Sequence, residues 1–142
     1  MKQLILAFVL LSFYSSKSLG QCDKKIFMSS SKTEFIDAGG TVQDTKEEKT
    51  TIEISKTDVL ITPGEEDHTM TGTIKSSTCD WKIPFKEGKM VIKAVLDNEQ
   101  GEKKNLTITI EGKDGKLTFL GEIEEMPDRK VRLMIDKFEE KK

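Results

Sequence analysis

Apolar and polar residues alternate along most of this chain, and turn-forming residues separate the alternating segments about every eight to twelve residues. The clearest segment, Leu106–Glu111, carries its leucine and two isoleucines on one face and two threonines and a glutamate on the other. Successive side chains of a strand point to opposite faces, so this period of two predicts a β-strand with one buried face. The chain is therefore expected to be all-β.

The same pattern marks further candidate strands. Thr33–Asp37 fits one helical turn as well as a short strand. We expect about seven or eight strands in all. The polar stretch Gln43–Lys49 is interpreted as a loop or as the fraying start of the next strand. Asp114-Gly115 is a strong hairpin-turn signal. The candidate segments are Lys25–Met28, Thr33–Asp37, Thr50–Ser55, Val59–Thr62, Thr69–Lys75, Met90–Leu96, Leu106–Glu111, Leu117–Leu120 and Val131–Asp136.

Short connections between neighbouring strands predict an antiparallel up-and-down meander. Such a sheet must close or cover its edges, because a long exposed edge invites aggregation. We therefore expect a lipocalin-like small barrel or a curved half-barrel, formed by one domain over residues 21–142.

The first twenty residues have the three-part layout of a secretory signal peptide. A positive start is followed by an apolar run, Leu4–Phe13, and by small residues at Ser18 and Gly20. The apolar run is too short to span a bilayer, and no second long run follows it. Cleavage after Gly20 would release a secreted or periplasmic protein without a membrane span.

Cys22 and Cys79 are the two cysteines of the chain. In an exported protein an even number favours a disulfide, and this one would stabilise the fold by about 4 kcal/mol in the chain-entropy model. Lipid modification of Cys22, two free thiols and pairing with another chain are the alternatives. Gln21 stands where lipoprotein signals have a small residue.

Charge and aromatic content exclude some partners. The formal net charge is −2, and Arg129 and Arg132 are the only arginines, so the basic surface that nucleic acid requires is missing. The only tyrosine, Tyr14, lies in the signal segment, which leaves Trp81 as the one residue with the rigid, partly polar ring common at recognition surfaces.

The segment Cys79–Phe85 concentrates the rarest residues of the chain. Trp81 and Phe85 could line the mouth of an apolar pocket, with Lys82 facing an acidic group of the ligand. The alternative is that both rings fill the core and that Pro84 ends a strand.

Catalytic and metal-binding patterns are missing. His68 is the only histidine, and it ends an acidic segment, Glu65–Asp67, without the spacing of a calcium loop or a zinc motif. The sequon Asn105-Leu106-Thr107 begins the best strand, and we expect it to be silent. No enzyme, cofactor or metal site is therefore expected.

Three segments carry a resemblance: Leu19-Gly20-Gln21, Cys79-Asp80-Trp81 and Ile110–Lys116. In them the chain resembles the short, uncharacterised exported β-proteins of Gram-negative bacteria. It implies no activity, and the similarity to lipocalins is one of architecture alone. The expected function is a small exported, non-enzymatic binding protein that carries a small apolar ligand. The alternative is an interaction or inhibitor module that acts through loops or a sheet edge.

Overall fold

The computed structural model describes residues 24–64, 69–97 and 101–141, and all its regular structure is β. The expected signal peptide, Cys22 and the acidic segment with His68 lie outside the described residues. The strands are β1 (Lys25–Ser30), β2 (Thr33–Ile36), β3 (Val42–Lys46), β4 (Thr50–Ile54), β5 (Asp58–Thr62), β6 (Met70–Ile83), β7 (Glu87–Asp97), β8 (Lys103–Lys113), β9 (Lys116–Ile123), β10 (Lys130–Met134) and β11 (Lys137–Lys141).

All eleven strands belong to one antiparallel sheet in the order β11-β1-β4-β5-β6-β7-β8-β9-β10-β2-β3. The all-β antiparallel meander is confirmed, since β4 to β10 follow one another in space as in sequence. The expected number of seven or eight strands was wrong. Closure into a barrel was also wrong, because no ladder joins the two end strands β11 and β3.

The larger strand count reflects β2, which is a strand rather than a helical turn, and the unpredicted β3 and β11. Bends also divide two long stretches of paired chain. Two residues separate β1 from β2, and two separate β10 from β11. The register continues across both bends, since Ser29 lies opposite Lys137 and Thr33 lies opposite Leu133. Each bend turns the chain from one half of the sheet into the other.

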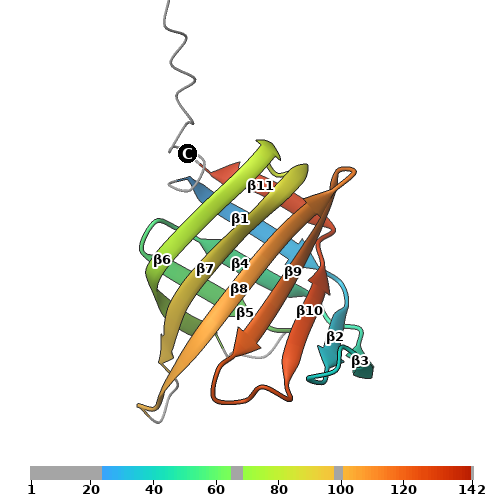
Figure 1. Ribbon diagram of the computed structural model, residues 1–142, viewed down its shortest axis with the longest axis vertical. Helices are drawn as coiled ribbons and strands as arrows, with labels where there is room; N and C mark the ends of the chain where they lie inside the picture. The colour runs from blue at the N-terminus through green and yellow to red at the C-terminus, as the bar shows by residue number, and fades with distance from the viewer. Residues whose placement is uncertain (1–23, 65–68, 98–100, 142) are drawn as a thin grey trace, which may run out of the picture.

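The sheet is strongly curved, so that β6 to β9 lie in front of β11, β1, β4 and β5 (Figure 1). The inward side chains of both halves form one core that includes Ile52, Ile54, Ile92 and Ile108, each at most 1% exposed. The predicted alternation is confirmed in β8, where Leu106, Ile108 and Ile110 are buried and Glu111 is exposed.

Three strand segments were not predicted. Val42–Lys46 forms β3 rather than a loop, although every residue in it is exposed. The strand β6 continues through Cys79 to Ile83 along β7, and the charged tail forms β11 along β1. The β3 segment and the charged tail carry no alternating apolar pattern, because most of their side chains are polar and exposed. Cys79, Trp81 and Phe138, in contrast, pack against the core. Within the described ranges the structure contains no helix that could cross a membrane.

Candidate functional site: an apolar pocket at one end of the sheet

An open pocket of about 320 Å³ enters the core at the end of the molecule where β2, β3 and the β9–β10 connection lie, the lower end in Figure 1. This volume is within the range typical of small-molecule sites. Every strand from β2 to β10 contributes at least one residue to the lining, and the connections between strands contribute others. The lining is Thr33, Phe35, Lys46, Glu48, Thr50, Ile61, Pro63, Met70, Leu96, Leu106, Phe119, Gly121, Ile123, Arg129, Val131 and Leu133.

Gly121 forms part of the pocket wall and faces inward from the middle of β9, opposite Ile108 and Val131. Glycine weakens a strand interior, and it often marks a place where something approaches the backbone closely. A Cβ atom at Gly121 would lie 3.3 Å from the ring of Phe119 and 3.8 Å from Leu106. A larger side chain here would therefore occupy the pocket.

The polar groups inside the pocket are satisfied within the protein. Thr33 and Thr50 line it, are at most 4% exposed, and share a hydrogen bond of 3.3 Å between their hydroxyl groups. One hydroxyl donates to the other, so an apolar group can lie against the pair without breaking this hydrogen bond.

Charged side chains stand at the rim of the pocket. The ammonium of Lys46 lies 5.6 Å from the centroid of the Phe35 ring, which also lines the pocket. Arg129 belongs to the β9–β10 connection, where its backbone N–H donates to the carbonyl of Met126 at 3.0 Å. Glu48 is the carboxylate that the described residues add to the lining, and one of its oxygens would lie 3.1 Å from a Cβ atom at Gly64.

The expected site residues lie elsewhere. Phe85 is buried between Trp81 and Phe138, with ring centroids 5.1 and 4.5 Å away. These three rings fill the end of the core near the β6–β7 turn, and none of them lines the apolar pocket. This placement favours the core-filling interpretation of Trp81 and Phe85, while ligand binding by them stays a prediction.

A three-residue turn joins β6 to β7 and carries Phe85. Phe85 has a positive φ of 57°, a left-handed conformation that costs a residue with a side chain about 1–2 kcal/mol. Gly112 lies next to this turn, where a Cβ atom would be 2.9 Å from the carbonyl oxygen of Lys86 and 3.1 Å from the Trp81 ring. The packing of Phe85 between two rings offsets the backbone strain.

Lys82 and Cys79 also lie away from the pocket. Lys82 is exposed and borders a shallow polar groove with Asp80, Lys89 and Glu111. Cys79 is half-buried against the core and is not a free thiol. Its expected partner Cys22 lies outside the described residues, so the Cys22–Cys79 disulfide stays a prediction.

The chemistry-bearing groups of the described residues form no cluster suited to a metal ion. The pKa of Glu125 lies below its usual value of 4.5, because its own backbone N–H and that of Asn105 donate to its carboxylate. The Asn105 side-chain amide donates to the same carboxylate at 2.9 Å. The nitrogen that a glycan would require is therefore engaged in the folded protein.

Sequence reasoning missed the pocket because its members are spread over nine strands. Phe35, Gly121 and Arg129 are far apart in the chain, and each looks ordinary in its own segment. Gly121, between Leu120 and Glu122 in an otherwise regular strand, was the one local signal that could have pointed to it. Comparison with known proteins adds nothing to this geometry, since no family model, curated protein or solved structure matches the chain.

Proposed function

We propose that this chain is a small exported binding protein without enzymatic activity and that the pocket around Gly121 holds a small apolar ligand. The observation that carries the proposal is the pocket itself: about 320 Å³ of open space lined mainly by apolar side chains. A core normally packs without such voids, because empty space costs stability. Space kept open to solvent in a small domain supports a binding role.

The distribution of side chains supports the same role. The sheet fills one end of its core with Trp81, Phe85 and Phe138, whereas the wall of the pocket at the other end contains Gly121, which has no side chain. The export part of the proposal rests on the sequence alone, in the layout of residues 1–20.

Methyl NMR of the chain beginning at Gln21, titrated with 1-octanol, tests the proposal. Octanol is neutral and small enough for the pocket, and we expect a dissociation constant of about 1 mM or below. The methyl signals of Leu96, Leu106 and Leu133 should shift together, because these residues line the pocket.

The methyl groups of Ile26 and Ile54 serve as the internal control, since they are buried and do not line the pocket. Uniform small shifts over both sets, or no saturable shift at all, would contradict the proposal. Trp81 is a poor reporter for this experiment because it packs among the rings near the β6–β7 turn.

A second candidate function is recognition of a protein through strand addition to β3. This strand ends the sheet, all five of its residues are exposed, and Val42 is a large apolar side chain that is 40% exposed. An unpaired strand edge is a template for an incoming strand. A partner protein that binds the native chain in a 1:1 ratio and is lost with Val42→Lys would support this candidate over ligand carriage.

A further inference from the structure

We propose that the ligand of this pocket is an amphiphile with one anionic head group, which faces Lys46 and Arg129 at the rim while an alkyl chain of about eight carbons fills the interior. The inference rests on the proposed function and adds the chemical class of the ligand. It follows from the size of the pocket and from the charges at its mouth.

Lys46 is held at the rim by its neighbours. It lies opposite Thr33 in the β2–β3 ladder, and its ammonium lies over the Phe35 ring at 5.6 Å from the centroid. Phe35 and Thr33 both line the pocket. An ammonium above an aromatic ring is attracted to its face, so the charge stays close to the entrance.

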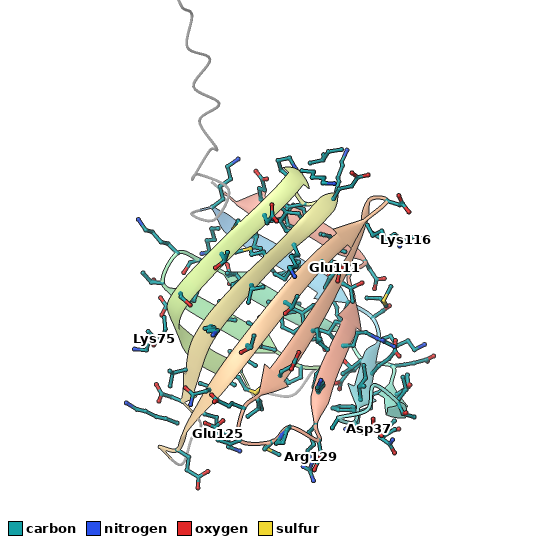
Figure 2. All side chains as sticks on the ribbon, viewed as in Figure 1. Asp37, Lys75, Glu111, Lys116, Glu125 and Arg129 are labelled. Atoms are coloured by element: carbon teal, nitrogen blue, oxygen red, sulfur yellow. The ribbon has the colours of Figure 1, made fainter. Side chains whose placement is uncertain are left out.

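Arg129 supplies the second positive charge from another part of the sheet. It lies in the β9–β10 connection, at the same end of the molecule as Asp37 and Glu125 and at the opposite end from Lys116 (Figure 2). Among the residues that the structure describes, neither Lys46 nor Arg129 has a carboxylate within 4.0 Å. Both side chains are exposed and can therefore turn toward a ligand.

Of the described lining residues, the remaining charged one is Glu48, whose carboxylate lies toward Gly64. Among the described lining residues, two cations and one carboxylate give a net positive charge. An anionic head group gains from this balance and a cationic one loses. Further inside, the polar side chains among the described lining residues are Thr33 and Thr50, whose hydroxyls share a hydrogen bond, so the head group stays at the rim.

The volume sets the length of the chain. At about 30 Å³ for each water-sized group, a pocket of about 320 Å³ accommodates about ten such groups. An eight-carbon chain with its head group at the mouth fits this space. Each methylene buried up to that length should improve the affinity about fourfold, since burial contributes about 0.8 kcal/mol for each methylene.

The test is isothermal calorimetry of the chain beginning at Gln21 with four octyl probes: octanoate, octyl sulfate, 1-octanol and octylammonium. We expect both anions to bind more tightly than octanol, and octylammonium to bind least tightly. Added salt should weaken the binding of the anions, because exposed charges are screened, while octanol should be insensitive to moderate salt.

The double variant Lys46→Gln/Arg129→Gln should bind octanoate about two- to tenfold more weakly and octanol within about twofold of the unmodified chain, since exposed charge pairs contribute modestly. The control, Lys113→Gln/Lys116→Gln, makes the same change in net charge at the opposite end and should leave both affinities unchanged.

The outcomes separate this inference from the function on which it rests. If octanol and octanoate bind equally and the double variant changes neither, the anionic head group is refuted while the apolar pocket stands. If both double variants lose octanoate affinity equally, the net charge of the protein rather than the charges at the rim explains the loss. The inference then fails. If no octyl probe binds, the proposed function itself fails.

Discussion

The carboxylate of Asp136 accepts two hydrogen bonds of 2.7 Å from Ser31, one from its backbone N–H and one from its hydroxyl. Ser31 lies in the bend between β1 and β2, and Asp136 lies in the bend between β10 and β11. The backbone N–H of Asp136 donates in turn to the carbonyl of Ser29 at 2.9 Å. One side chain thus bridges the two bends at which the sheet folds over.

Removal of this bridge should destabilise the protein. We expect Asp136→Ala to lower the free energy of unfolding by about 1–2 kcal/mol, because the two charge-assisted hydrogen bonds are lost from an exposed site. Urea unfolding should show a lower midpoint with an unchanged m-value. Asp128→Ala is the control, since this exposed aspartate has no hydrogen bond among the described residues. An equal loss in both variants would contradict the role of the bridge.

Phe85 is expected to be a major source of stability at the β6–β7 turn. Phe85→Ala should cost about 3–4 kcal/mol, since it leaves a cavity between Trp81 and Phe138. The emission of Trp81 should also move to longer wavelength as water reaches its ring. Ile83→Ala, at a neighbouring residue that is 46% exposed, should cost less than about 1 kcal/mol. A Phe85→Ala variant as stable as the unmodified chain would refute the packing described here.

Gly112 should tolerate no side chain. Gly112→Ala places a Cβ atom 2.9 Å from the backbone oxygen of Lys86, and a backbone atom cannot move aside as a flexible side chain can. We expect a loss of about 1–3 kcal/mol in urea unfolding, the usual cost of overpacking. Gly39→Ala provides the comparison, because its Cβ would meet Asp37 at an ordinary 3.5 Å. Equal stability of the two variants would argue against the tight turn.

Phe85 lies in the segment Cys79–Phe85, which the sequence singled out for its rare residues without predicting that β6 continues through it to Ile83. The alternating pattern predicted β4, β5 and β8 because each buries one face, as Ile52 and Ile108 do. It could not predict β3 or β11, because most of their side chains are polar and exposed, although Phe138 of β11 packs against the core. The same limit hid the pocket, since no local pattern shows that Phe35 and Gly121 face one space.

Glu125 should contribute to the pH dependence of stability. Hydrogen bonds from its own backbone and from that of Asn105 hold the pKa of this carboxyl below 4.5 in the folded protein. Its contribution is therefore fully present above pH 4.5 and is lost as the pH falls through the lower folded value. The stability difference between the unmodified chain and Glu125→Gln should be largest near neutral pH and should shrink on acidification. Glu124→Gln, at the neighbouring residue, is the control. A stability difference between the unmodified chain and Glu125→Gln that grows toward low pH would contradict the lowered pKa of Glu125.

The central claim is that the space beside Gly121 is a binding site. Gly121→Leu should fill it, whereas Leu120→Phe adds bulk on the opposite face of the same strand, where Leu120 lies beside Thr109 and Arg132. Urea unfolding should show that both variants are folded, and Gly121→Ala is the smaller replacement if leucine is not tolerated. Calorimetric titration with 1-octanol is then the most direct measurement. We predict saturable binding by the unmodified chain and by Leu120→Phe, and at least a tenfold loss of affinity in folded Gly121→Leu. Equal octanol affinity in all three would contradict the account.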